Sequence, residues 1–166
     1  MEYNDVYRKT NQHHMQLNWI YKSFHLLTVE ELYAIMQLRN EVFSVEQNCV
    51  YQDADDKDQA SFHLAGWDGN KLAAYCRILP AGLSYDSPSI GRVVSSPAYR
   101  KCGCGQQLMQ LAITKTLEQF NHPTITISAQ FYLEKFYSHL GFQQISDIYD
   151  EDGIPHIKMQ LLSGSK

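Results

Sequence analysis

The chain has 166 residues, of which 44% are hydrophobic and 19% are charged, a balance that gives one globular domain enough apolar side chains for a core. Its formal net charge of −4 argues against a broad nucleic-acid-binding surface, because such a surface needs a basic face. No apolar run approaches the roughly 20 residues that cross a bilayer. The polar N-terminus also lacks the apolar stretch of a signal peptide, so we expect a cytoplasmic protein without a membrane partner.

The first part of the chain predicts a polar extension, a strand and a helical region. Residues 1–15 are predicted as an extension, and residues 16–166 as a single domain. Residues 17–24 alternate as a strand does, and residues 28–31 (Thr-Val-Glu-Glu) have the pattern of a capping box. One helix, or two short helices, should therefore begin there and reach about Gln47.

The next segments predict a loop followed by three strands. Residues 53–58 (Asp-Ala-Asp-Asp-Lys-Asp) fail the ligand pattern of a calcium loop, so we expect a solvated acidic loop that attracts a cationic amine. Strands over residues 62–67 and 72–79 flank an Asp-Gly-Asn turn typical of a hairpin. Residues 89–95 predict a further strand.

The second half of the chain alternates helices and strands. Residues 105–120 carry apolar side chains at helical spacing and form the clearest predicted helix. Residues 123–129 predict a strand, and residues 133–140 predict a short helix that ends at Gly141. Alternating apolar residues over 157–161 predict a final strand. This order predicts an α/β fold of the α+β type, with a mixed sheet and one parallel pair across residues 89–129.

The four cysteines give no indication of a metal site or a disulfide framework. Cys49, Cys76, Cys102 and Cys104 form no CxxC pair and join no Cys/His ligand set. We therefore expect four free thiols and no bound metal. Because a helix N-terminus lowers a thiol pKa, either cysteine of the 102–104 pair is a candidate for oxidation.

The segment 100–106 (Arg-Lys-Cys-Gly-Cys-Gly-Gln) joins a predicted strand to the clearest helix. Free backbone amides and the helix dipole create positive potential there, and two glycines let an anion approach the backbone closely. Such a turn is suited to a pyrophosphate group. The motif alone fits a tight turn at least as well, and it matches neither the dinucleotide fingerprint nor the P-loop.

A second motif at residues 136–142 (Phe-Tyr-Ser-His-Leu-Gly-Phe) follows the next strand. Together, the two motifs resemble the GNAT acetyltransferase superfamily, and the chain is most similar to its ElaA-type branch. The likeness covers about residues 17–162. The ElaA-type resemblance is carried by residues 38–43, 45–47, 51–53, 62–64, 90–94 and 151–156.

The resemblance implies a GNAT-like acyl-CoA N-acyltransferase fold with splayed central parallel strands. Acetyl-CoA would be the cosubstrate, with its pantetheine arm in the gap between the strands and its pyrophosphate on the glycine turn. A backbone amide at the gap would polarise the thioester carbonyl. The implied cofactor contacts are Val93, Val94, Ser95, Arg100, Lys101, Cys102, Gly103, Cys104, Gly105, Gln106 and Gln130.

The resemblance also suggests catalytic residues, for which structural roles stay open. Tyr137 occupies the place of a proton donor to the departing thiolate, although a half-buried aromatic residue is the alternative. Glu46, His63 and the acidic loop over residues 53–58 are all candidates for the base, but Glu46 also fits an exposed helix end and His63 a core histidine. Arg92 should either face solvent or pair with a carboxylate such as Glu46 or Glu41.

The resulting prediction is an N-acetyltransferase that moves an acetyl group from acetyl-CoA to a primary amine. The alternatives are a catalytically weak acyl-CoA-binding sensor or partner module and, on the glycine turn alone, a nucleotide-binding domain of another family. The acceptor is a small molecule or a peptide. The acidic segments 46–60 and 149–156 favour a cationic acceptor. A monomer and a homodimer are both compatible with the sequence.

Overall fold

The computed structural model describes residues 16–164, so the predicted extension over residues 1–15 lies outside the described residues. The strands are β1 (Asn18–Ser23), β2 (Phe62–Asp68), β3 (Lys71–Leu79), β4 (Ser89–Ser95), β5 (Thr124–Gln130), β6 (Gln143–Gln144), β7 (Tyr149–Glu151) and β8 (Ile154–Leu162). The α-helices are α1 (Val29–Arg39), α2 (Cys104–Phe120) and α3 (Glu134–His139). A π-helical segment, η2 (Asn40–Glu46), continues α1, and shorter turns are η1 (Phe24–Leu26), η3 (Pro97–Tyr99) and η4 (Phe131–Leu133).

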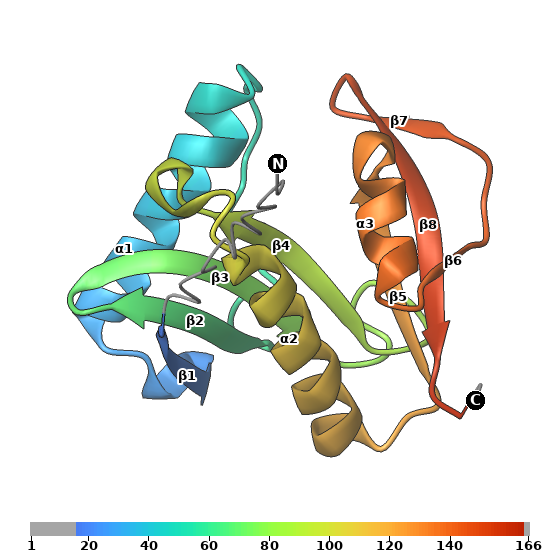
Figure 1. Cartoon of the computed structure of the whole chain (residues 1–166), viewed down its shortest axis with the longest axis horizontal. Helices are drawn as coiled ribbons and strands as arrows, with labels where there is room; N and C mark the ends of the chain where they lie inside the picture. The colour runs from blue at the N-terminus through green and yellow to red at the C-terminus, as the bar shows by residue number, and fades with distance from the viewer. Residues whose placement is uncertain (1–15, 165–166) are drawn as a thin grey trace, which may run out of the picture.

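The strands form one mixed sheet in the order β1-β2-β3-β4-β5-β8-β6, and β7 pairs with β8 beside this path. All described neighbours are antiparallel except β4 and β5, which are parallel. The helix α2 makes the crossover between these two strands (Figure 1). The predicted mixed α/β class and the parallel pair are therefore confirmed.

Most predicted elements appear within one to three residues of their expected ends, because each has a strong local determinant. The capping box before α1 is formed: the Glu31 amide donates to Thr28 Oγ1 at 3.1 Å, and the Thr28 amide donates to Glu31 Oε2 at 2.9 Å. Gly141 follows α3 with a φ of +95°, a conformation that favours glycine. The sequence did not predict β6 and β7, which are too short to show an alternating pattern.

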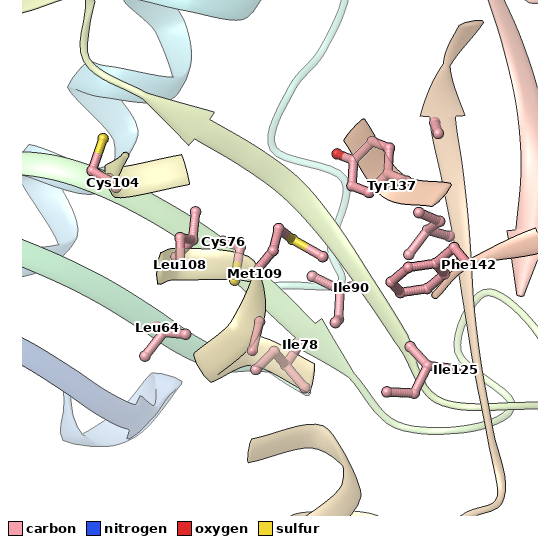
Figure 2. Packing of buried hydrophobic residues seen from close by; sticks show 14 of the residues in the cluster. Leu64, Cys76, Ile78, Ile90, Cys104, Leu108, Met109, Ile125, Tyr137 and Phe142 are labelled. Carbon is pink, nitrogen blue, oxygen red and sulfur yellow. The ribbon is translucent and has the colours of Figure 1, made fainter. Parts of the chain in front are cut away.

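Helices cover both faces of the sheet and build two apolar cores. On one face, Ile35 and Leu38 of α1 pack with Tyr75 and Val94 of the sheet. On the other face, α2 contributes Leu108 and several neighbours to a larger core that continues to Phe142 and Ile125 beyond the β4–β5 junction (Figure 2). Successive strand residues point to opposite faces, so a single strand such as β3 supplies both cores.

The strands β4 and β5 stay together at only one position, where Ser89 is opposite Thr126. Beyond it they diverge, and Figure 1 shows β5, β8 and α3 standing apart from β1–β4. The divergence coincides with a bulge in β4: Tyr75 is opposite Val94 and Arg77 is opposite Gly91, so one β3 residue faces two β4 residues. Arg92 in this bulge has a φ of +50°, a strained value for a residue with a side chain. The expected splay of the central strands is confirmed.

Candidate active site

A cavity of about 730 Å³ fills the space between the diverging strands. Its walls come from β4, β5, α3, η2, the start of α2 and the turn after β7. The cavity lining includes Ser89, at the point where β4 and β5 still pair. At another part of the wall it meets Arg100 and Gly105, which belong to the glycine turn. A ligand that reaches from this turn into the gap would contact both central strands.

The glycine turn has one glycine that the backbone requires and one that it does not. Gly103 caps α2 with a φ of +84°, and the preceding Lys101 has a φ of +64°. Gly105 has no such requirement, and a Cβ atom placed on it would meet no atom within 4 Å. The alternative that the turn merely needs two glycines therefore accounts for Gly103 and leaves Gly105 unexplained.

The predicted cofactor residues fall into two groups. Six of them line the cavity: Val93, Val94, Ser95, Arg100, Gly105 and Gln130. The other five lie at the turn without lining the cavity: Lys101, Cys102, Gly103, Cys104 and Gln106. No side chain caps the N-terminus of α2 at Gly103, so side chains leave this helix start open.

The expectation of two oxidation-prone thiols is wrong for Cys104. Its side chain is buried, and its Sγ lies 3.1 Å from the carbonyl oxygen of Tyr99. Burial raises the pKa of Cys104 to about 11, since desolvation outweighs the effect of the helix N-terminus. Cys102 Sγ lies 2.7 Å from the same carbonyl.

Tyr137 lies on α3 at the wall of the cavity. Its side chain is buried against Phe136 and Phe142, and Figure 2 shows its hydroxyl directed away from Phe142 and toward β4. Desolvation raises the pKa of the Tyr137 hydroxyl well above its ordinary value. The hydroxyl therefore stays protonated at neutral pH, as a proton donor requires.

Glu46 lines the cavity, but its carboxylate is already engaged. Glu46 Oε2 lies 2.8 Å from Arg100 Nη2, and both side chains are 41% exposed. The next residue, Gln47, makes a longer contact: Gln130 Nε2 donates a hydrogen bond to Gln47 Oε1 at 3.4 Å. These two contacts join the end of η2 to the glycine turn and to β5.

His63 lies outside the cavity lining, buried within the sheet. Its Nδ1 is 2.8 Å from the Tyr75 hydroxyl and its Nε2 is 3.0 Å from the carbonyl oxygen of Asp58. Burial lowers the pKa of His63, so the ring is neutral at neutral pH. Both ring nitrogens have hydrogen-bonding neighbours. The position of His63 therefore supports the interpretation as a core histidine and does not support a role as the base.

The loop over residues 53–58 was predicted as solvated, and this prediction is wrong. Three of its four aspartates, Asp53, Asp55 and Asp58, form ion pairs. Their partners are arginines from three elements: Arg39 of α1, Arg77 of β3 and Arg92 of β4. The distances are 2.7 Å for Arg39–Asp53, 2.7 Å for Arg39–Asp58, 2.6 Å for Arg77–Asp55, 3.0 Å for Arg77–Asp58 and 2.7 Å for Arg92–Asp53. We call these six residues the Arg–Asp cluster.

The Arg–Asp cluster is electrically balanced and largely buried. The Arg39 side chain has no exposed surface, and the Asp58 carboxylate accepts from both Arg39 and Arg77. Burial alone would raise the pKa of Asp58, but the two guanidinium groups outweigh it and lower the pKa. The loop therefore presents little free negative charge to a cationic substrate.

Arg92 pairs with carboxylates, as one of the two expectations held, but they belong to Asp53 and Asp55 and not to Glu46 or Glu41. Its Nε lies 2.7 Å from Asp53 Oδ1, its Nη2 lies 3.5 Å from Asp55 Oδ2, and its guanidinium stands 5.9 Å from the centre of the Tyr51 ring. Neither Glu46 nor Glu41 contacts it in the part of the chain that the structure describes. These contacts hold Arg92 in its strained conformation at the bulge.

Sequence reasoning missed a polar group on β5. Ser128 Oγ lies 2.6 Å from the Tyr149 hydroxyl and donates to Glu151 Oε2 at 2.9 Å. Ser128 and Glu151 both line the cavity, together with Tyr85. The residues come from β5, from β7 and from the loop before β4, so no local spacing indicated them. Glu151 belongs to the acidic segment 149–156, which the sequence predicts to favour a cationic acceptor, but the sequence assigns no individual role to it.

Two negative findings concern residues 16–164. No group of three or more His, Cys, Asp or Glu side chains in this range is placed to hold a metal ion. No helix in this range is long and apolar enough to cross a membrane. The four cysteines are free thiols.

Comparisons with known proteins match both the motifs and the fold. A family model described as an acetyltransferase (GNAT) domain matches residues 28–163. Protein ElaA of Escherichia coli K12 is 45% identical over 139 residues, which are 80% of this chain and 88% of that protein. The UPF0039 protein sll0451 of Synechocystis is 40% identical over 146 residues, which are 87% of this chain and 95% of that one.

Solved structures agree with the sequence comparisons. An acyl-CoA N-acyltransferase from Pseudomonas aeruginosa superposes with a TM-score of 0.84 at 41% identity, covering 88% of this chain and 99% of that one. The crystal structure of Escherichia coli ElaA superposes with a TM-score of 0.83 at 38% identity, with the same coverage of 88% and 99%.

Proposed function

The chain belongs to the GNAT acetyltransferase family, in its ElaA-type branch, and we propose that it transfers an acetyl group from acetyl-CoA to a primary amine. Members of this family use acyl-CoA cosubstrates. Acetyl as the acyl group, a primary amine as the acceptor and the cytoplasm as the site of action all belong to the proposal. The proposal also includes a single catalytic domain over residues 16–166.

The observation that carries the proposal is the cavity between β4 and β5. It provides room for an extended arm between two strands that pair at only one position. It also meets the start of α2, where Gly105 leaves open space beside helix amides. A pyrophosphate binds well at such a helix start. The pantetheine arm would then run along Val93–Ser95, with Gln130 opposite.

The reaction follows from this placement. A neutral amine attacks the thioester carbon, the carbonyl oxygen gains negative charge, and an amide of the 93–95 segment stabilises that charge. Collapse of the intermediate breaks the carbon–sulfur bond. The Tyr137 hydroxyl, kept protonated by burial, donates its proton to the departing thiolate.

The proton lost by the amine needs an acceptor other than His63. Glu46 lines the cavity, but its carboxylate is paired with Arg100. We propose that the coenzyme phosphates take over Arg100 when they bind, and that Glu46 is then free to accept the amine proton through a water molecule.

A thermal melt with and without acetyl-CoA tests the coenzyme part of this proposal. Selective binding to the folded protein adds about 2.7 kcal/mol of stability at 100 times the dissociation constant. We expect acetyl-CoA and CoA to raise the melting midpoint, while ATP and NAD do not. A midpoint that none of the four ligands moves would contradict the proposal. A shift for ATP or NAD alone would favour a nucleotide-binding domain.

Turnover is measured separately, as release of the CoA thiol in the presence of an amine panel. Release that depends on both acetyl-CoA and an amine supports the transferase. Tight coenzyme binding with no release across the panel would instead support the sensor or partner module.

A further inference from the structure

The part of the cavity near Ser89 lies beyond the part that the coenzyme arm is proposed to occupy. Two residues past the single β4–β5 pair on each strand come Gly91 and Ser128, and four residues past it come Val93 and Gln130. A coenzyme that enters from Arg100 and extends along Val93 therefore points its acyl group toward Ser128. The groups around Ser128 are in a position to meet the acceptor.

Ser128 is the centre of a hydrogen-bonded group that we call the Ser128 hub, formed with Tyr149 and Glu151. Its hydroxyl lies 2.6 Å from the Tyr149 hydroxyl and 2.9 Å from Glu151 Oε2. Tyr85 lines the cavity together with Ser128 and Glu151. The hub thus fixes one carboxylate on a cavity wall that also carries aromatic rings.

Glu151 differs from the other acidic side chains of the cavity in how it is placed and paired. Glu46 pairs with Arg100 at 2.8 Å, and Asp55 pairs with Arg77 at 2.6 Å. Within residues 16–164, neither Glu151 nor its neighbour Asp152 forms an ion pair. Glu151 accepts from Ser128, whereas no side-chain hydrogen bond of Asp152 is found there. Glu151 is therefore an exposed carboxylate that Ser128 orients and that no ion pair of residues 16–164 neutralises.

We propose that Glu151 binds a positively charged group of the acceptor, and that the acceptor is an amine with a second cationic group. This inference rests on the proposed transferase function. The bound charge is the second group because the reacting nitrogen must be neutral when it attacks. A carboxylate beside that nitrogen would stabilise its protonated form and hinder the reaction.

The opposite wall does not provide an equally free site for an anionic acceptor group. Arg77 and Arg92 are neutralised by the aspartates of the Arg–Asp cluster. Lys57 lines the cavity and carries a positive charge, but its Nζ donates to Ser84 Oγ at 2.9 Å. An acceptor with a carboxylate would have to use Lys57, and the experiment below includes this outcome.

The test compares matched acceptors and matched variants. The acceptors are α,ω-diamines of three to six carbons, amino alcohols of the same lengths and amino acids of the same lengths. Each is supplied with acetyl-CoA, and thiol release gives kcat and KM. The variants are Glu151→Gln, which keeps an oxygen for Ser128 but removes the charge, and Asp152→Asn as the control.

We expect kcat/KM for the preferred diamine to exceed that of the matched amino alcohol by about tenfold, the range for a hydrogen-bonded charge. Glu151→Gln should abolish this preference by raising KM, with kcat little changed, and Asp152→Asn should keep it. Equal use of diamines and amino alcohols, preference for the amino acids, or a loss of kcat instead of KM in Glu151→Gln would each overturn the inference.

The melt with acetyl-CoA separates this inference from the proposed function. If acetyl-CoA raises the midpoint of the wild-type protein and of Glu151→Gln equally, but no diamine is acetylated, the inference fails and the coenzyme proposal stands. If acetyl-CoA leaves the wild-type midpoint unchanged, the proposed function fails first.

Discussion

The Arg–Asp cluster and the glycine turn both contribute charged residues to the cavity wall. The charges of the cluster are buried and paired with one another, whereas Arg100 at the turn is partly exposed. In the cluster, three guanidinium groups and three carboxylates close on one another, and Arg39 has no exposed side-chain surface. At the turn, Arg100 has one partner, is 41% exposed, and stands near an open helix start.

The difference shows how to separate structural charges from charges that are free for a ligand. Removing one partner of a buried ion pair leaves the other charge without compensation, whereas an exposed pair contributes little to stability and can exchange its partners for a ligand. The cluster therefore anchors the loop and the bulge of β4, whereas the turn is where we propose that the coenzyme phosphates bind. The predictions below test this contrast.

The largest expected effect comes from Arg39→Met, which removes the most buried charge of the cluster. Asp53 and Asp58 would each lose a partner while remaining poorly exposed, so we expect a loss of about 3–5 kcal/mol in the free energy of unfolding. Urea denaturation measures it. The control is Lys115→Ala, which removes an exposed pair with Glu118 and should cost about 0.5 kcal/mol or less. Similar losses in the two variants would contradict a structural role for the cluster.

Tyr137→Phe tests the proposed proton donor at the wall of the same cavity. It removes the hydroxyl and keeps the ring that packs on Phe136 and Phe142. We expect kcat for acetyl transfer to fall by about 100-fold, with acetyl-CoA affinity and melting midpoint nearly unchanged. Thiol-release kinetics measure the first quantity and thermal melts the others. Unchanged kcat would leave Tyr137 as a packing residue only.

Acid should lower the free energy of unfolding in two steps, one from His63 and one from the Arg–Asp cluster. The pKa of His63 is lowered by burial from 6.5, so the unfolded chain takes up a proton first and stability falls as pH drops below about 6.5. The pKa of Asp58 is lowered from 3.8 because Arg39 and Arg77 outweigh its burial, so stability falls again below about 3.8. Denaturation midpoints measured from pH 8 to pH 3 reveal both steps.

Two variants assign these steps to their residues. His63→Gln should remove the upper step, and Asp58→Asn should reduce the lower one, each at some cost in stability at neutral pH. Part of the lower step should remain in Asp58→Asn, because Arg77 and Arg92 also lower the pKa of Asp55 against its desolvation. A profile with the same two steps in both variants would show that other groups cause the acid sensitivity.

At the turn, Gly105→Ala should separate ligand binding from stability. Its Cβ would meet no protein atom, and alanine favours a helix over glycine by roughly 0.5–1 kcal/mol, so the melting midpoint should stay or rise. The added methyl group would still stand where the phosphates approach the backbone, and we expect about tenfold weaker CoA binding by calorimetry.

Gly103→Ala is the matched comparison for that variant. Gly103 has a φ of +84°, so a side chain there strains the turn and should lower the melting midpoint. If Gly105→Ala behaved in the same way as Gly103→Ala and left CoA affinity intact, both glycines would be structural.

The smallest expected effect comes from Glu46→Gln, which frees Arg100 from its exposed pair. Such pairs contribute about 0–1 kcal/mol, so CoA binding should tighten by roughly two- to fivefold at most. Calorimetry at low salt measures it, and Arg100→Gln should weaken binding instead. Weaker CoA binding in Glu46→Gln would mean that Glu46 orients Arg100 rather than competing for it.

Local patterns in the sequence determined the element order and located the glycine turn. The capping box at Thr28, the apolar face of residues 105–120 and the alternation in 89–95 each act over a few residues, where backbone geometry decides the outcome. The two motifs around Gly103 and Tyr137 then indicated the family and the splayed pair of strands.

Only the tertiary structure decided which charges pair. Arg39, Arg77 and Arg92 lie on three elements that meet because of the sheet order, so no spacing in the sequence showed that they would neutralise the 53–58 loop. The Ser128 hub arises in the same way, from strands that become neighbours only when the sheet forms. The state of a charge depends on burial and on its nearest partners, and the folded chain sets both over long sequence distances.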